Sequence, residues 1–257
     1  MTRAPLISVV IPAYNEERYL RATLESCLSL RPCPEIVVAD GGSTDATRRI
    51  AESLGARAIQ CPQRGRAFQM NEGARAASGD VLLFLHADTT LDSRCWEALH
   101  SALRDAAVCF GGFRRCFAPP SLLLTIGSWL AILRGRIWKI FLGDQAIFVR
   151  RDAFERIGGY SPILLFEDID LCRRLRRVGR GKLLSARVTT SRRRFQAEGN
   201  ARRLARNVWL WLRYYFGADA NRLARVYYPG YYDAGLPDGD SDAATSESSR
   251  SGRVSKL

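Results

Sequence analysis

Residues 6–17 read LISVVIPAYNEE, and this stretch decides the fold class. The run up to Ile11 is short, apolar and β-branched, which is typical of a buried strand, and it ends at Pro12. Residues 16–30 then carry apolar side chains at helical spacing. The stretch therefore predicts a strand, a loop and a helix in that order.

The same unit recurs along the first half of the chain. Residues 35–39 predict a second strand that stops at Asp40 in the sequence DGGSTD, and residues 46–54 suit a helix capped by Ser43 or Thr44. Further strands are expected at 57–60 and 81–85, and further helices at 67–77 and 96–105. This alternation predicts an α/β fold with a mainly parallel sheet covered by helices on both faces, in one domain.

The second half is less regular. Residues 121–142 are apolar but interrupted by arginine and lysine, too often for a transmembrane helix. Residues 146–149 resemble a strand, while residues 169–178 and 201–216 suit helices. Residues 235–257 turn to Asp, Ser, Gly and Thr with little to bury, so we expect a disordered tail there.

The charge balance restricts the partners without selecting one. The 257 residues contain 39 Lys and Arg against 26 Asp and Glu, a formal net charge of +13, and nearly all the excess is arginine. Arginine suits phosphate because its guanidinium is a planar fork of donors. Nucleic acid, an anionic membrane surface and phosphorylated small molecules all fit this balance.

The cysteines and the N-terminus indicate a compartment. Seven scattered cysteines without a C-x-x-C pair suggest neither a disulfide framework nor a zinc site. The first apolar run is too short for a signal peptide. We therefore expect reduced thiols and a cytoplasmic protein.

Acidic residues follow three of the predicted strands, in the loops 13–17, 40–45 and 86–90. In parallel sheets, ligands bind beyond the carboxyl ends of the strands. A buried strand-end carboxylate such as Asp88 is costly unless a cation meets it, and a divalent metal on a diphosphate would do so. A turn or cap would also explain Asp88, and an Asx turn would explain Asp40 beside its two glycines.

Other residues carry similar pairs of interpretations. Glu167 and Asp168 precede a helix, where they suit either the helix dipole or a general base. Arg66 could meet a phosphate or be a solvated side chain. No G-x-G-x-x-G follows the first strand and no P-loop is present, and the two histidines, His86 and His100, are too few for most triads or histidine-rich metal sites.

Four segments in order resemble the family-2 glycosyltransferases. They are residues 9–17 (VVIPAYNEE), 40–45 (DGGSTD), 79–88 (GDVLLFLHAD) and 166–171 (FEDIDL). Residues 143–160 are similar to the segment that precedes the Glu-Asp motif in that family. Within the family, LHADT at 85–89 and GRAFQMN at 65–71 resemble a bacterial subgroup labelled selenodomain-associated or arsenosugar-biosynthesis glycosyltransferases, a label that assigns no substrate.

The resemblance implies a GT-A fold and a metal-dependent, inverting transfer of one sugar. It implies a nucleotide-sugar-binding half (1–110) and an acceptor-binding half (111–200), while the residues beyond them predict a basic aromatic helical segment (201–234). Asp168 would be the catalytic base, Glu167 would orient the acceptor or share that role, and Asp88 would hold Mg²⁺ or Mn²⁺. The implied donor-site residues are Pro12, Tyr14, Glu16, Asp40, Arg66, His86 and Asp88, and the implied acceptor-site residues are Asp144 and Gln145.

The donor implied is a UDP- or GDP-sugar, and the acceptor a small molecule or a lipid-linked one. Two departures from the family pattern matter. His86 stands where the family commonly has Asp, so Asp88 would be the only direct protein ligand of the metal. The Q-x-x-R-W signature of processive enzymes is absent, which favours transfer of a single sugar.

Residues 201–228 combine arginines with Trp, Tyr and Phe. Such a segment suits peripheral contact with the inner face of a membrane, or a helix whose aromatic side chains pack on the core. A rival hypothesis is a non-catalytic protein that binds nucleic acid or anionic lipid through this segment. Nucleic acid is disfavoured because the acidic strand-end loops would repel phosphates.

Overall fold

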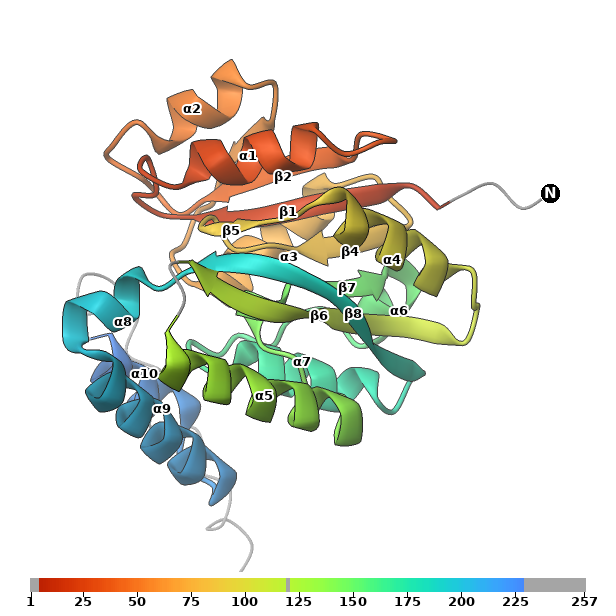
Figure 1. The fold of residues 1–257 in the computed structure, drawn as a ribbon. Helices are drawn as coiled ribbons and strands as arrows, with labels where there is room; N and C mark the ends of the chain where they lie inside the picture. Colours follow the sequence, from red (N-terminus) through yellow and green to blue (C-terminus); the bar gives the residue numbers. More distant parts are fainter. Residues whose placement is uncertain (1–4, 119–120, 229–257) are drawn as a thin grey trace, which may run out of the picture.

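The computed structural model describes residues 5–118 and 121–228. Within them, one mixed sheet has the strand order β3-β2-β1-β4-β7-β6-β8-β5, with helices on both faces (Figure 1). The strands are β1 (Ile7–Ala13), β2 (Glu35–Asp40), β3 (Arg57–Gln60), β4 (Val81–Phe84), β5 (Thr89–Thr90), β6 (Val108–Ala118), β7 (Ile147–Arg150) and β8 (Arg180–Ser191). The helices are α1 (Leu20–Leu28), α2 (Thr47–Ser53), α3 (Arg66–Ala76), α4 (Ser93–Leu103), α5 (Leu122–Ile137), the 3₁₀ turn η1 (Gly143–Gln145), α6 (Arg151–Arg156), α7 (Glu167–Leu175), α8 (Arg193–Glu198), α9 (Asn200–Tyr215) and α10 (Ala220–Tyr227).

The first half of the sheet is parallel, as predicted. Strands β3, β2, β1 and β4 pair side by side, with Ala13 opposite Asp40 and Val10 opposite Phe84. This register brings the carboxyl ends of β1, β2 and β4 to one edge of the sheet. The three acidic loops that follow these strands therefore start from the same edge.

The second half differs from the expectation. β7 runs antiparallel to both β4 and β6, and β5 runs antiparallel to β8, while β6 and β8 are parallel to each other. The α/β class and the single domain are confirmed, but the sheet is more mixed than predicted, and β6 and β8 were not predicted at all. Gly111 explains part of the difficulty, because a Cβ there would lie 2.6 Å from the Phe148 ring. Glycine therefore stands inside β6 and interrupts the apolar pattern that signals a strand.

The core forms two layers because neighbouring strand residues point to opposite faces. Val9 and Ile11 of β1 pack with α1 and α4 on one face, where Leu24 and Leu99 are fully buried. Val10 lies in the other layer, with α3, α6 and α7. The continuous burial of β1 is what a central strand covered on both faces requires.

Two predicted helix starts are corrected. The expected helix at 16–30 spans only Leu20–Leu28, and the expected helix at 46–54 begins at Thr47 without a side-chain cap from Ser43 or Thr44. Asp45 instead accepts a hydrogen bond from the Thr47 N–H at 2.9 Å. Both helices therefore begin later than predicted, and the α2 end is met by the side chains of Asp45 and Glu17 rather than by Ser43 or Thr44.

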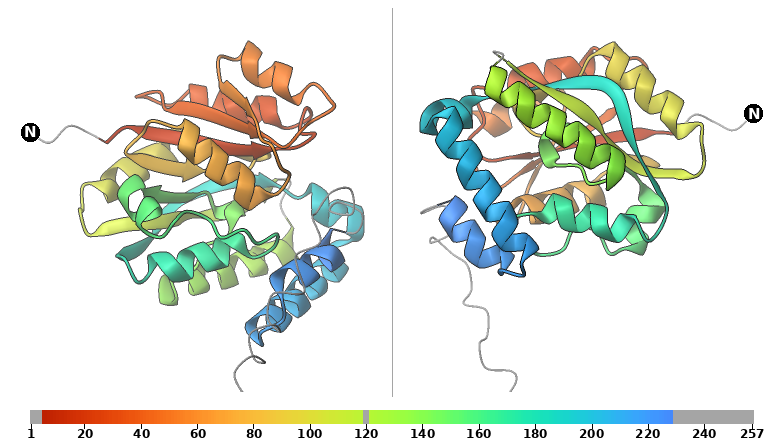
Figure 2. Two further views of the ribbon diagram at one scale, coloured as in Figure 1. Left: turned by 180° about the vertical axis from the view of Figure 1, so that it is seen from behind. Right: turned by 60° about the horizontal axis from the view of Figure 1, so that its bottom comes forward.

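The described part of the basic aromatic segment, up to residue 228, forms α9 and α10, which pack at one corner of the domain (Figure 2). Leu210 of α9 and Leu223 of α10 form a buried cluster with Leu164 and Leu165, the residues before α7. None of the helices in the described ranges is long and apolar enough to cross a membrane. The tail expected at 235–257 lies outside the described residues.

Candidate active site

The loops after β1 and β2 are tied together by side chains. The Asn15 N–H donates to Ser43 Oγ at 2.9 Å, and Asn15 Oδ1 accepts from the Thr44 N–H at 2.9 Å. Glu17 Oε2 accepts from the Ala46 N–H at 3.0 Å. The left-handed backbone at Asn15, with φ of 53°, turns the first loop toward the second. The two loops therefore form one wall at the edge of the sheet.

Asp40 lies at the base of this wall and is 3% exposed. Its Oδ2 accepts from the N–H groups of Gly42 at 3.2 Å and Ser43 at 3.0 Å, and the Ser43 hydroxyl donates to its Oδ1. Gln69 of α3 lies against Gly41 and donates to the carbonyls of Ala13 and Ala39 at the ends of the two strands, at 2.7 and 2.9 Å. The Asx turn that was the simpler interpretation of Asp40 is present in the fold.

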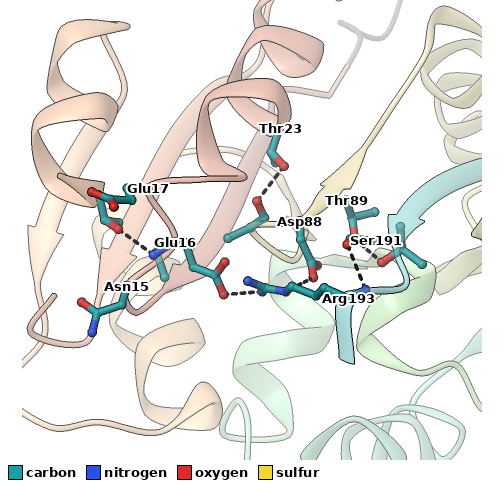
Figure 3. Close-up of polar contacts among 12 residues, drawn as sticks. Asn15, Glu16, Glu17, Thr23, Asp88, Thr89, Ser191 and Arg193 are labelled. Atoms are coloured by element: carbon teal, nitrogen blue, oxygen red, sulfur yellow. Dashed lines mark hydrogen bonds and ion pairs between the residues drawn. The ribbon is translucent and has the colours of Figure 1, made fainter. Parts of the chain in front are cut away.

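Arg193 joins two of the predicted site residues (Figure 3). Its Nε donates to Asp88 Oδ2 at 2.9 Å, and its Nη2 lies 2.5 Å from Glu16 Oε1. The guanidinium also lies over the Tyr19 ring, 4.4 Å from the centroid. Two largely buried carboxylates from the loops after β1 and β4 thus face one shared positive group at the start of α8.

His86 connects this edge to the acidic pair on α7. A Cβ at Gly143 would lie 2.8 Å from His86 Cε1, so the imidazole rests directly on the glycine backbone. The Gly143 N–H in turn donates to Asp168 Oδ2 at 2.8 Å. His86 and Asp168, which are distant in sequence, are therefore separated by one glycine residue of η1.

Asp168 and Glu167 lie in the first turn of α7, where Glu167 is buried and Asp168 is partly buried. Burial raises the pKa of Asp168 to about 7, and the neighbouring Glu167 carboxylate adds to the rise. The N–H groups of Gly143 and Ile169 oppose the rise because they donate to the charged form. A carboxyl with its pKa near neutrality can accept a proton at physiological pH.

Arg66 faces Glu167 rather than the acidic loops. Its Nη1 lies 3.5 Å from Glu167 Oε1, and its Nη2 donates to the Tyr228 hydroxyl. Both sides of the contact are buried, since the Arg66 side chain is 22% exposed and that of Glu167 is 4% exposed. The C-terminal segment thus reaches the acidic pair through Tyr228.

The two predicted acceptor residues have different surroundings. Gln145 is fully buried, donates to the Phe113 carbonyl at 2.9 Å and accepts from Arg134 at 2.8 Å, so it joins η1 to β6 and α5. Asp144 pairs with Arg115 and remains partly exposed. Arg115 also lines a cavity of about 490 Å³ between β6 and α5. Asp144 is therefore accessible to a ligand, whereas the hydrogen bonds of Gln145 connect elements of the fold.

Tyr14 and Pro12 lie at the end of β1. Pro12 is buried in the strand opposite Ala39, and the Arg64 guanidinium lies 3.7 Å from the centre of the Tyr14 ring. Arg64 precedes α3 and presents its cation on the same side as the loop after β1. This cation–π pair therefore links the segment before α3 to the loop after β1.

Sequence reasoning missed Arg193 and Gly143. Arg193 stands in a run of three arginines, 192–194, and nothing local marks it as a partner of acidic residues 105 and 177 positions away. Gly143 was part of a family-like segment, but its contact with His86 depends on the tertiary packing.

The carboxylates at this edge can be compared with the ligand set that a divalent metal needs. Among the described residues, no group of three or more His, Cys, Asp or Glu side chains could hold a metal ion by itself. Mg²⁺ is often held by one or two carboxylates plus substrate phosphates. Glu16 and Asp88, which already share a cation in Arg193, fit a metal that arrives with a diphosphate.

Comparison with known proteins gives a consistent result. The sequence profile of glycosyl transferase family 2 matches residues 8–158. The probable glycosyltransferase YdaM of Bacillus subtilis (strain 168) is 28% identical over 205 residues, which are 70% of this chain and 48% of the relative. The PGL/p-HBAD biosynthesis glycosyltransferase of Mycobacterium bovis (strain BCG / Pasteur 1173P2) is 34% identical over 171 residues, 62% of this chain and 64% of the relative. The chain thus spans about half to two thirds of these relatives.

Solved structures share the fold. The mannosyltransferase of Pyrobaculum calidifontis in complex with GDP-Man and Mn²⁺ has a TM-score of 0.58 and 24% identity, and the alignment covers 73% of this chain and 57% of that one. S. aureus TarS 1-349 in complex with UDP-GlcNAc has a TM-score of 0.60 and 21% identity, covering 73% and 59%. At these identities the likeness establishes the GT-A fold.

Proposed function

Because this chain belongs to glycosyl transferase family 2, we propose that it moves one sugar from a nucleotide-sugar donor to a hydroxyl acceptor, with inversion at the sugar and with a divalent metal. The observation that carries this proposal is the chain of contacts across the sheet edge. Glu16 and Asp88 share one cation, and His86 and Gly143 lead from the same edge to Asp168.

The donor would lie along the loops after β1, β2 and β4, in the half formed by residues 1–110. Pro12 and Tyr14 would line the nucleotide site. Asp40, at the foot of the two loops, would contact the nucleobase of the donor. The relatives in the solved structures bind GDP-Man and UDP-GlcNAc, which supports a GDP- or UDP-sugar as donor class. Arg66 would act on Glu167, which it contacts, and so position the acceptor side of the site.

Arg193 would bind the diphosphate of the donor. Its guanidinium has the fork geometry that phosphate requires, and it already lies between Glu16 and Asp88. Asp88, with Glu16 beside it, would hold Mg²⁺ or Mn²⁺ on that diphosphate. The metal would supply charge stabilisation to the departing nucleoside diphosphate.

Asp168 would be the general base. Its carboxylate would take the proton of the acceptor hydroxyl while that oxygen attacks C1 of the sugar and the bond from C1 to the diphosphate breaks. The N–H groups of Gly143 and Ile169 hold the two carboxylate oxygens at 2.8 Å each, so the group cannot rotate away. Glu167 would orient the acceptor, held in turn by Arg66.

The acceptor would enter through the half formed by residues 111–200, where Asp144 pairs with Arg115, a residue that lines the cavity between β6 and α5. The acceptor would be either a small molecule or a lipid-linked molecule that carries a hydroxyl group. All seven cysteines are free thiols, which supports a reducing, cytoplasmic compartment. The motifs at 65–71 and 85–89 support placement in the selenodomain-associated or arsenosugar-biosynthesis subgroup, without naming a substrate.

A donor panel tests the proposed function. The purified chain is incubated with UDP- and GDP-sugars and Mn²⁺ or Mg²⁺, and release of nucleoside diphosphate is measured, slow donor hydrolysis included. We expect release from at least one donor, abolished by EDTA and by Asp88→Ala. If no donor yields nucleoside diphosphate and none stabilises the protein against heat, the transferase function is wrong.

A further inference from the structure

Helix α5 is apolar on two opposite sides. Its inner side buries Leu124 and Ala131 against the sheet. The opposite side carries large apolar side chains that are more than half exposed, namely Ile126, Trp129, Leu130, Leu133 and Ile137. A surface helix of a water-soluble domain normally presents polar side chains on its outer face. The outer face of α5 is therefore apolar where a solvent-exposed helix face is normally polar.

Helix α9 repeats this arrangement. Leu210 is buried and Tyr214 stacks on Phe166, which fixes the inner side against α7. The outer side carries a shallow apolar hollow of about 480 Å³ lined by Ala201, Leu204, Ala205, Val208, Trp209 and Leu212. Beyond it, Tyr215 is 61% exposed and Phe216 is 80% exposed. Packing on the core, one of the two alternatives for this segment, thus uses only one side of the helix.

These exposed apolar side chains are concentrated in one region. Within the described residues, every exposed large apolar side chain other than Leu6 and Val226 belongs to α5, to α9 or to the residue directly after each helix. The two helices contact each other and form the lower surface of the molecule in Figure 1, which turns toward the viewer in the right panel of Figure 2. The exposed apolar side chains of these two neighbouring helices are called the α5–α9 surface.

Arginines border this surface. Arg202 and Arg213 are exposed and lie along one side of α9, next to the apolar row, and Arg136 is exposed on α5. The Arg213 guanidinium lies 5.5 Å from the Trp209 ring. Apolar and indole side chains beside exposed cations match the two layers of a membrane interface, where acyl chains lie beneath anionic headgroups. The net charge of +13 supports the same partner.

We propose that the α5–α9 surface docks on an anionic lipid bilayer, with the outer sides of both helices inserted at the headgroup boundary and the arginines on the lipid phosphates. The contact is peripheral, because none of the described helices can span a bilayer. This inference does not rest on the proposed transferase activity, so each can fail without the other.

Vesicle flotation with the full chain tests the proposal. We expect the protein to float with vesicles of phosphatidylcholine and phosphatidylglycerol, and far less with phosphatidylcholine alone. The double variant Leu130→Ser/Leu212→Ser should lower partitioning at least about tenfold, because both side chains lose apolar burial in the lipid. Leu6→Ser removes another exposed leucine, just before β1 and outside the surface, and should partition like the unchanged protein.

The charge component has its own variant. Arg202→Gln/Arg213→Gln should abolish the preference for phosphatidylglycerol, and added salt should have the same effect on the unchanged chain. Circular dichroism checks that the variants are folded. Failure of the unchanged chain to float, or equal flotation of Leu130→Ser/Leu212→Ser, overturns the proposal. So does a dimer in light scattering that the leucine variant dissociates, because the surface would then cover a second copy.

Discussion

The replacement Arg193→Gln tests the charge arrangement at the sheet edge. The side chains of Arg193, Glu16 and Asp88 are 24%, 13% and 11% exposed, so the two ion pairs lie between the surface and the buried case. Exposed pairs contribute about 0–1 kcal/mol, while removing one partner of a buried pair costs about 3–5 kcal/mol. We expect the free energy of unfolding to fall by about 1–3 kcal/mol, because Glu16 and Asp88 are left facing each other without a cation.

The same variant should respond more strongly to metal. Under the proposed function, Mn²⁺ would have to compete with the guanidinium for Asp88 in the unchanged chain, whereas in Arg193→Gln the two carboxylates would be open to it. A ligand at about 100 times its Kd stabilises a folded protein by about 2.7 kcal/mol. Urea unfolding with Mn²⁺ and with EDTA should therefore show a larger metal-dependent gain in Arg193→Gln than in the unchanged chain.

Two controls make the result interpretable. Arg48→Gln removes an exposed pair with Glu52, whose side chains are 47% and 54% exposed, and should change stability by at most about 1 kcal/mol. Adding Asp88→Ala to Arg193→Gln should remove the metal response. If Arg193→Gln is as stable as the unchanged chain and gains no more from Mn²⁺, the shared-cation reasoning is wrong.

The other predictions concern Asp168 and Gly143. Asp168→Asn should keep donor binding in calorimetry and lower kcat by about 10²–10⁴-fold, and an equal loss of both would contradict the base role. Because burial raises the pKa of Asp168 to about 7, kcat should rise as pH increases through about 7. A carboxyl whose pKa is raised in the folded state stabilises the fold at low pH, and this stabilisation is lost as pH rises from about 4 to 7. Asp168→Asn should therefore have a higher melting temperature than the unchanged chain at pH 8, but not at pH 4. Gly143→Ala should lower the free energy of unfolding by about 1–3 kcal/mol and should lower kcat, because the added Cβ displaces His86. Gly127→Ala is the control: a Cβ there meets nothing within 4 Å, so the change should be neutral or stabilising. Equal melting temperatures for the two variants would refute the contact between Gly143 and His86.

The parallel half of the sheet could be predicted because its signals are local. In β1, the apolar run and the proline show the strand and its end within a few residues, and burial on both faces makes the run continuous. The strands β6 and β8 were not predicted, because Gly111 and neighbouring arginines interrupt the apolar pattern. Their pairing depends on segments about 70 residues apart, such as Gly111 opposite Lys182, which no local pattern encodes.

Sequence patterns were enough for the alternating strands and helices of the first half and for the acidic residues after β1, β2 and β4, because strand and loop preferences act between near neighbours in the chain. Which charged side chains form ion pairs follows from the tertiary structure. It placed Arg193 between Glu16 and Asp88, directed Arg66 to Glu167, and set His86 on Gly143 beside Asp168. Charge pairing and desolvation depend on distance in space, which residue spacing along the chain does not fix.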